Sequence, residues 1–253
     1  MNTDPPSPSQ QSGRLLWLSR KPDPDVGARL FCFPYSGASA SMYGRWPRRV
    51  GNVELCFVQP PARQRRIREP HYETYEALAA DLVEFLVPYL DKPFGFFGHC
   101  GGALPGVELT RQLAAAGLPL PRRVFVSSQV APQDGPYGRL LTMSEDELGE
   151  ELLRLIRSMG GQGDPDPDLV RLGHRLLVKD IEANKRYVVS SPFRLPVGVT
   201  AIGWTTDEEI PIDLMGGWKE TSDDCRFTVL EGGHFEFLSA PEQLLAEFSR
   251  DLG

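Results

Sequence analysis

The stretch FGFFGHCGGALPG, residues 94–106, sets an apolar run, a glycine-rich turn and a helical pattern directly one after another. Within the turn, Cys100 stands between Gly98 and Gly102, which gives the spacing glycine, any residue, nucleophile, any residue, glycine. Between a strand and a helix this spacing is typical of a nucleophile elbow, in which a tight turn holds a reactive side chain clear of a sheet. Enzymes with such an elbow usually have serine at the central position, whereas this chain has cysteine.

Short apolar runs alternate with helical patterns along most of the chain. The pattern predicts strands over 29–34, 53–59, 94–97, 123–128, 197–204 and 226–233, and helices over 72–90, 103–117 and 241–252. Strands that alternate with helices indicate parallel units whose sheet is covered on both faces. Together with the nucleophile elbow, this pattern predicts an α/β-hydrolase fold, with a mostly parallel central sheet flanked by helices. Its 253 residues suit one domain over 14–253, preceded by a polar, flexible tail over 1–13.

One region, about 132–190, breaks the alternation because no strand pattern occurs there. Ser144 and Glu147 form a capping-box pattern before leucines at helical spacing, and a second helical pattern follows the loop GGQGDPDPD at 160–168. A helical insertion at this place emerges beside the carboxyl ends of the strands, where α/β proteins have their sites. We therefore expect a helical lid, although helices that only pack on the sheet are the alternative.

Composition and charge exclude several classes of protein. The formal net charge of −7 argues against nucleic acid as a partner. No apolar run approaches the ~18 residues of a membrane span, and the N-terminus lacks the apolar segment of a signal peptide. The spacing of the four cysteines suggests neither disulfides nor a metal site, and Cys32 and Cys56, which lie in apolar runs, are expected to be small buried apolar residues. We expect a cytoplasmic monomer with no metal and no cofactor.

The partners of an elbow nucleophile follow it in the chain, first an acid and then a histidine. His234 stands in a glycine-flanked loop after the strand that ends near Leu230, and it is the only one of the four histidines in such a place. Asp207, with Glu208 and Glu209 beside it, follows the strand that ends at Trp204. We therefore expect Cys100, His234 and Asp207 to be the catalytic residues.

Asp134 is a rival for the acid, because it follows the strand that comes directly after the nucleophile. Some enzymes with this arrangement of residues place their acid after that strand. Both assignments stay open at the level of the sequence.

An oxyanion hole needs two backbone donors near the nucleophile. Gly101, directly after Cys100, supplies one N–H group. The other is expected from the loop after an early strand, and the turn FPYSGASA at 33–40 has that position, with Ser36 as the donor.

Four motifs together, FCFPYSGASA, VQPPARQRR, FGFFGHCGGA and LEGGHFEFL, resemble the type II thioesterases of polyketide and nonribosomal peptide pathways. The resemblance runs from about Leu30 to the C-terminus. It implies an acyl-enzyme mechanism, a helical lid and a substrate site that includes Tyr35. The implied partner is an acyl carrier or peptidyl carrier protein, which presents the acyl group on phosphopantetheine. The family normally has serine followed by methionine at the elbow, where this chain has Cys100 and Gly101.

The loop PPARQRRIRE at 60–69 contains four arginines. One interpretation is a docking patch in which Arg63, Arg65 and Arg66 contact an acidic carrier or its phosphate, since guanidinium groups suit phosphate. The alternative is a solvated charged loop.

The cysteine leaves two enzymatic hypotheses open. In the first, a thioesterase hydrolyses carrier-bound acyl groups through an acyl-Cys100 intermediate. In the second, an acyl or aminoacyl transferase moves the group between carriers, because exchange of one thioester for another is nearly thermoneutral. A carrier-binding protein without activity is disfavoured by the intact histidine and oxyanion loop, and an engineered serine-to-cysteine change is disfavoured by Gly101.

Overall fold

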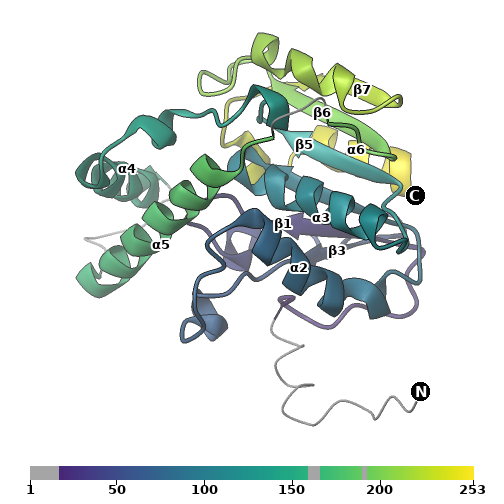
Figure 1. The fold of residues 1–253 in the computed structure, drawn as a ribbon, viewed down its shortest axis with the longest axis horizontal. Helices are drawn as coiled ribbons and strands as arrows, with labels where there is room; N and C mark the ends of the chain where they lie inside the picture. The colour runs from purple at the N-terminus through teal and green to yellow at the C-terminus, as the bar shows by residue number, and fades with distance from the viewer. Residues whose placement is uncertain (1–16, 159–165, 190–192) are drawn as a thin grey trace.

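The computed structural model describes residues 17–158, 166–189 and 193–253, in which seven strands form one sheet. The strand order is β2-β3-β1-β4-β5-β6-β7, and every neighbouring pair is parallel except β2 with β3. The prediction of a mostly parallel sheet flanked by helices is therefore confirmed (Figure 1). The strands are β1 Ala28–Phe33, β2 Arg49–Val50, β3 Val53–Phe57, β4 Phe94–His99, β5 Arg123–Ser127, β6 Gly198–Trp204 and β7 Cys225–Leu230.

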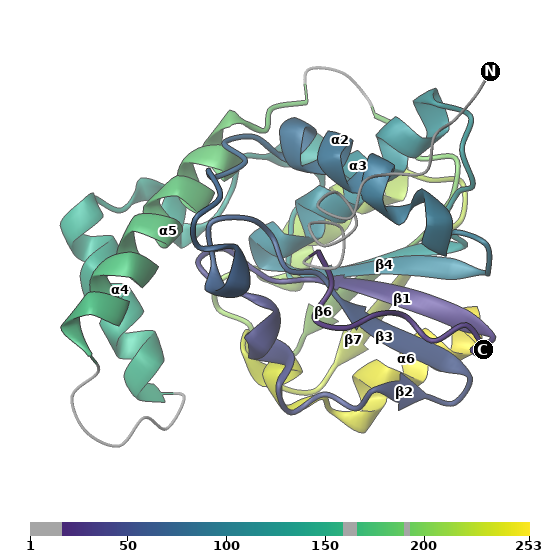
Figure 2. The same ribbon diagram turned by 90° about the horizontal axis from the view of Figure 1, so that it is seen from below.

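Helices cover both faces of the sheet. Helices α2 (Tyr75–Leu86) and α3 (Ala103–Ala115) lie on one face, and helix α6 (Glu242–Leu252) lies on the other (Figure 2). Two buried apolar clusters correspond to these two layers. This arrangement leaves the carboxyl ends of the parallel strands along one edge, where their loops meet.

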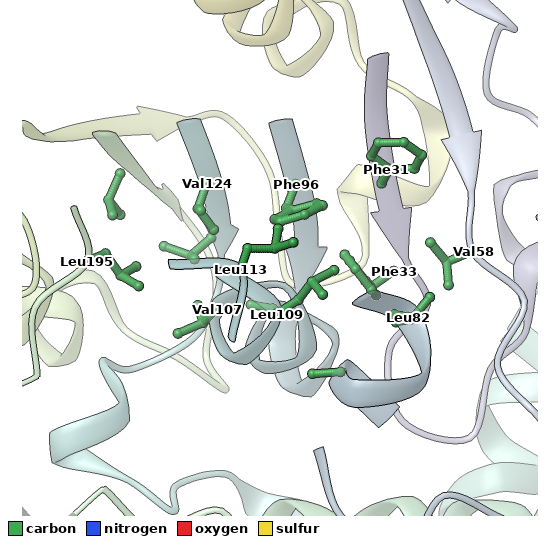
Figure 3. Packing of buried hydrophobic residues seen from close by; sticks show 14 of the residues in the cluster. Phe31, Phe33, Val58, Leu82, Phe96, Val107, Leu109, Leu113, Val124 and Leu195 are labelled. Carbon is green, nitrogen blue, oxygen red and sulfur yellow. The ribbon is translucent and has the colours of Figure 1, made fainter. Parts of the chain in front are cut away.

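Successive side chains of a strand point to opposite faces of the sheet, so the residues of each strand alternate between the two apolar layers. Phe31, Phe33 and Phe96 belong to the layer under α2 and α3, where Figure 3 shows Phe33 beside Leu82 and Leu109. The intervening strand residues belong to the opposite layer, among them Leu30, Cys32 and Phe97. Cys56 is buried in the first layer, so the prediction that Cys32 and Cys56 are buried apolar residues is confirmed.

Helix α2 is shorter at both ends than the predicted range 72–90. Thr74 precedes the helix with extended backbone, and its side chain accepts a hydrogen bond from the Ala77 N–H group at 3.2 Å. The α-helix ends at Leu86, and a 3-10 turn over Val87–Tyr89 follows. Pro88 explains this end, since proline has no N–H group to continue the helical hydrogen bonds.

The segment between β5 and β6 contains helices and no strand among its described residues. Short 3-10 helices cover Pro132–Asp134 and Arg139–Thr142, and α4 (Glu145–Ser158) and α5 (Pro167–Arg186) follow. The two long helices pack against each other and project beyond the sheet (Figures 1 and 2). The capping box is present, because the Glu147 N–H group donates to Ser144 Oγ at 3.3 Å and the Ser144 N–H group donates to Glu147 Oε2 at 2.7 Å.

The two helices of the insertion differ in how far they are buried. In α4, Leu148 is fully buried, whereas most of the other described side chains remain partly or fully exposed. The C-terminal half of α5 is buried among the loops at the sheet edge, with Leu176, Leu177, Asp180, Ile181, Ala183 and Asn184. This half of α5 is therefore part of the core.

Two predicted segments lie wholly or mostly outside the described residues, and some observed elements were not predicted. The tail over 1–13 and most of the loop at 160–168 lie outside the described residues. The edge strand β2 and a 3-10 helix over Ile212–Glu220 were not predicted. Among the described helices, none is long and apolar enough to cross a membrane.

The burial of the C-terminal half of α5 and the exposure of α4 predict that α4 opens more readily than that half of α5. Amide hydrogen exchange should be faster for Glu147–Arg154 than for Leu176–Asn184, because local opening of α4 exposes little apolar surface. Exchange measured by mass spectrometry on the whole protein tests this, with β4 as the slow reference. Equal protection of the two segments would contradict the prediction.

Candidate active site

The elbow after β4 places Cys100 in a strained backbone conformation. Its φ angle is +51°, in the left-handed region that residues with a Cβ atom rarely adopt. A Cβ atom at Gly98 would lie 2.1 Å from the Gly102 carbonyl oxygen and 2.4 Å from Ala103 Cα. Only glycine allows the strand and the start of α3 to approach so closely, and this contact turns the Cys100 side chain toward the sheet edge.

The loops after β6 and β7 bring Asp207 and His234 together at this edge. His234 Nδ1 lies 3.0 Å from Asp207 Oδ2 and 3.1 Å from Oδ1. Both side chains are largely buried, with residue exposures of 7% for Asp207 and 9% for His234. His234 and Cys100 line the same cavity, so the structure brings the three predicted catalytic residues into one site.

Three other hydrogen bonds orient the Asp207 carboxylate. Its Oδ1 atom accepts the backbone N–H groups of Glu209 at 2.9 Å and Ile210 at 3.0 Å, and its Oδ2 atom accepts the Ser128 hydroxyl at 2.6 Å. Burial alone would raise the pKa of Asp207, but the bonds and charge of His234, together with these donors, lower it well below the usual range. The carboxylate therefore stays ionised and holds Nδ1 of the imidazole.

With Nδ1 directed to Asp207, Nε2 of His234 is the ring atom left for the nucleophile. Burial tends to lower the pKa of His234, but the hydrogen bond to Asp207 and the charge of a Cys100 thiolate raise it to about 10. Glu209 Oε2 lies 3.6 Å from Nε2 and acts in the same direction. The site therefore stabilises the imidazolium form of His234 that proton transfer to this ring produces.

His99 packs beside this pair on the α6 side of the sheet. Its ring stacks on Phe237 with centroids 3.9 Å apart and lies 4.6 Å from the ring of His234. His99 Nδ1 lies 2.9 Å from Ser127 Oγ. Burial and the charge of His234 lower the pKa of His99 well below its usual value, so His99 stays neutral and supports the His234 ring by packing.

The rival acid, Asp134, lies elsewhere. It is exposed in the 3-10 turn Pro132–Asp134, and a Cβ atom at Gly217 would lie 1.8 Å from its Oδ2 atom. Its carboxylate therefore lies against the 3-10 helix over Ile212–Glu220, and the acid that contacts His234 is Asp207.

The two predicted oxyanion donors lie side by side. Ser36 follows β1, the neighbour of β4, and a Cβ atom at Gly101 would lie 2.8 Å from Ser36 Oγ. Ser36 is 8% exposed, and the same Cβ atom would lie 3.4 Å from the Tyr75 hydroxyl. The loop after β1 and the first turn after Cys100 therefore form one wall of the site.

A cavity of about 420 Å³ opens between this wall and the insertion. Cys100, His234 and Tyr35 line it from the sheet edge, and Tyr35 packs near Phe235 with ring centroids 6.2 Å apart. The insertion contributes apolar side chains, namely Leu140, Leu152, Ile156, Leu169 and Leu177. A chain bound to Cys100 therefore has an apolar wall to pack against.

Charged side chains line another part of the cavity. Arg139 donates to Glu151 Oε1 at 2.7 Å and to Glu209 Oε1 at 3.2 Å. Glu151 belongs to α4 and Glu209 to the loop after β6, so Arg139 joins the insertion to the loop that carries the acid.

Two of the three arginines predicted to dock a carrier protein are buried. Arg63 is 3% exposed and binds Asp180 in a bidentate ion pair, with distances of 2.9 and 3.0 Å. Arg66 is 5% exposed, pairs with Glu69 and lies over the Trp17 ring. This corrects the interpretation of Arg63 and Arg66 as carrier contacts, because both guanidinium groups are buried against partners within the chain. Arg65 is exposed.

Ser128 and Asp180 are polar residues of the site region that the sequence analysis missed. Ser128 directly follows β5 in the sequence VSSQ, and a polar residue at the carboxyl end of a parallel strand was a signal that pointed to it. Asp180 gave no local signal, because its partners lie more than 100 residues earlier in the chain. Among the described residues, no group of three histidine, cysteine or carboxylate side chains has the arrangement of a metal site.

Comparison with known proteins gives consistent matches over nearly the whole chain. A family model described as a thioesterase domain matches residues 28–252. Thioesterase PikA5 of Streptomyces venezuelae is 32% identical over 227 residues, which cover 87% of this chain and 79% of that protein. Linear gramicidin dehydrogenase LgrE of Brevibacillus parabrevis is 32% identical over 237 residues, which cover 90% of this chain and 89% of that protein.

A solved structure gives a similar result. RedJ, a thioesterase from the prodiginine biosynthetic pathway in Streptomyces coelicolor, is 31% identical and superposes with a TM-score of 0.77. The match covers 92% of this chain and 94% of RedJ. The α/β-hydrolase fold predicted from the sequence is thus shared with a solved relative.

The contacts of His234 predict how its ionisation responds to substitution. Asp207→Asn removes the negative charge next to Nδ1, so the pKa of His234 should fall by about 1 to 3. NMR titration of the His234 ring in both proteins measures this, and Asp134→Asn is the matched control that should leave the curve unchanged. An unchanged curve in Asp207→Asn would show that Asp207 does not stabilise the imidazolium.

Proposed function

Because the chain belongs to the thioesterase family, we propose that it is a stand-alone thioesterase of a polyketide or nonribosomal peptide pathway that takes acyl groups from carrier proteins onto Cys100. The observation that carries this proposal is the elbow, which sets a thiol beside the paired His234 and Asp207 in an apolar cavity. The names of PikA5 and RedJ as thioesterases support the reaction class, and the RedJ pathway supports the setting.

In the acylation step, His234 takes the proton of the Cys100 thiol, and the thiolate sulfur attacks the thioester carbonyl carbon of the substrate. The oxygen of the tetrahedral intermediate becomes negative, and the backbone N–H groups of Ser36 and Gly101 stabilise it. The bond between the carbonyl carbon and the pantetheine sulfur then breaks. The leaving thiolate receives the proton from His234, so acyl-Cys100 and a free carrier thiol are the products.

In the second step, a water molecule gives a proton to His234 and attacks acyl-Cys100. The carbon–sulfur bond breaks, the carboxylic acid leaves, and the proton returns to the Cys100 sulfur. Asp207 keeps Nδ1 bound throughout and stabilises the imidazolium in both steps.

A second candidate function is acyl transfer, and the specific observation that favours it is the cysteine itself. Serine converts a thioester into an oxygen ester, which releases free energy that a return to a thiol would have to supply. Cysteine preserves the thioester, so a second carrier thiol regains the acyl group at little cost, and a thiolate outcompetes water as a nucleophile at neutral pH.

The dehydrogenase named among the relatives does not change this proposal. Dinucleotide-binding domains have a glycine-rich turn after the first strand, followed by a long helix whose N-terminus holds the pyrophosphate. Here the loop after β1 leads into the four-residue 3-10 helix Ala40–Tyr43, and Gly37 is the one glycine between them. The described residues therefore lack the features that hold a nicotinamide dinucleotide at this place.

The role of Asp207 predicts a large loss of rate when its charge is removed. Asp207→Asn should lower the rate of Cys100 acylation by about 10⁴, as the loss of an orienting carboxylate does in related triads. Asp134→Asn, which changes a carboxylate away from His234, should leave the rate within about twofold of the native value. Acylation is followed by intact-protein mass spectrometry with an acyl-carrier substrate. Reversed effects of the two substitutions would overturn the assignment of the acid.

The two candidate functions predict different products and different effects of Cys100→Ser. If the task is transfer, acyl-Cys100 should persist in water for minutes and discharge rapidly to a second holo-carrier, while Cys100→Ser should release mainly free acid. If the task is hydrolysis, native protein should release free acid at once, and serine should change only the rate. Product analysis by mass spectrometry separates the cases.

Cys225→Ser is the control for this experiment, because Cys225 is the other partly exposed thiol. It should acylate and discharge like the native protein. Acylation that persists in Cys100→Ala would overturn the proposal as a whole.

A further inference from the structure

Helix α5 carries a buried carboxylate that contacts the proposed oxyanion loop. Asp180 is 1% exposed, and its Oδ2 atom accepts the backbone N–H group of Gly37 at 2.7 Å. Gly37 directly follows Ser36, the proposed donor. A side chain of the insertion therefore sets the orientation of the peptide next to that donor.

The buried charge of Asp180 has an ion-pair partner and several hydrogen-bond partners. Arg63 donates to both carboxylate oxygens, and Oδ1 also lies 2.7 Å from His71 Nε2 and 2.8 Å from the Tyr72 hydroxyl. Arg63 in turn donates to the Ala38 carbonyl oxygen at 2.7 Å. The loop after Ser36 is thus held at two successive residues, through its N–H group by Asp180 and through its carbonyl group by Arg63.

The same helix reaches the second proposed donor one turn later. Asn184 is 4% exposed, and a Cβ atom at Gly101 would lie 2.8 Å from Asn184 Nδ2. In addition, Leu177 packs on Gly37, since a Cβ atom there would lie 3.0 Å from Leu177 Cδ1. Helix α5 therefore contacts both loops that are proposed to bind the oxyanion.

We propose that Asp180 is a positioning residue for the oxyanion hole. Through its hydrogen bond to the Gly37 N–H group, Asp180 couples the position of helix α5 to the placement of the Ser36 N–H group. This inference rests on the proposed function, because it concerns the tetrahedral intermediate formed on Cys100. Asp180 has no contact with Cys100, His234 or Asp207 among its hydrogen bonds, so it acts through the loop. When α5 is seated, the loop is ordered for acylation, and when α5 shifts, the Gly37 N–H group loses its acceptor.

The decisive variant is Asp180→Asn, examined with two reactions of the same thiol. Acylation by a short-chain acyl N-acetylcysteamine thioester passes through an oxyanion, whereas alkylation by iodoacetamide displaces iodide and forms none. We expect the saturated acylation rate to fall by about 10², the effect of losing one oxyanion donor, with KM changed less than about threefold. The alkylation rate of Cys100, assigned by peptide mapping, should stay at the native value.

Glu182→Gln is the matched control, because Glu182 lies on the exposed side of the same helix and pairs with Lys185. It should leave both rates unchanged. A parallel fall of acylation and alkylation in Asp180→Asn would mean that Asp180 only supports the fold, and an unchanged acylation rate would mean that it has no role in the loop. Either result overturns the inference.

A second variant keeps the test decisive if Asp180→Asn does not fold. Arg63→Lys keeps the positive charge beside Asp180 but loses the bidentate geometry, and it should slow acylation by about tenfold at an unchanged alkylation rate. Equal changes in both rates would again overturn the inference. Failure of the proposed function is a separate outcome, since native protein would then form no acyl-Cys100 with the thioester while Cys100 would still react with iodoacetamide.

Discussion

The left-handed backbone of Cys100 is the constraint on which the rest of the site depends. A residue with a Cβ atom pays about 1–2 kcal/mol to adopt this conformation, so the surrounding structure must hold it there. Strand β4 is paired with β1 on one side and β5 on the other, and Gly98 lets α3 begin directly against the strand. The loop after β1 then reaches Cys100 from one side, and the loops after β6 and β7 reach it from the other, all at the same sheet edge.

Two buried carboxylates serve this arrangement in different ways. Burial raises the pKa of both Asp180 and Asp207, but their partners outweigh it, and both stay ionised. The main partner of Asp180 is Arg63, which keeps its charge at all accessible pH values, so Asp180 transmits only geometry. The partner of Asp207 is His234, which gains and loses a proton during the reaction, so Asp207 influences the chemistry itself.

The sequence predicted those parts of the site that depend on strand order and local turns. Cys100, Asp207 and His234 were found because each follows an apolar run, and parallel strands bring such positions to one edge. Arg63 was wrongly predicted to be a docking residue because its neighbours in the sequence are polar. Its ion-pair partner, the Asp180 carboxylate, lies 117 residues later in the chain. In the sequence, α5 has the pattern of an ordinary amphipathic helix of the insertion. The same long-range pairing explains why its C-terminal half is part of the core.

The choice between hydrolysis and transfer depends on the cavity as well as on the nucleophile. Glu209 lies 3.6 Å from His234 Nε2 and binds Arg139, so this side of the cavity is charged. The opposite wall is apolar, with Leu152 and Leu177. Hydrolysis of an acyl-Cys100 intermediate requires a water molecule at His234, and polar side chains bind water better than apolar ones. Under the proposed mechanism we therefore expect acyl chains that pack only on the apolar wall to be hydrolysed, and chains that also fill the space beside Glu209 to pass to a second thiol.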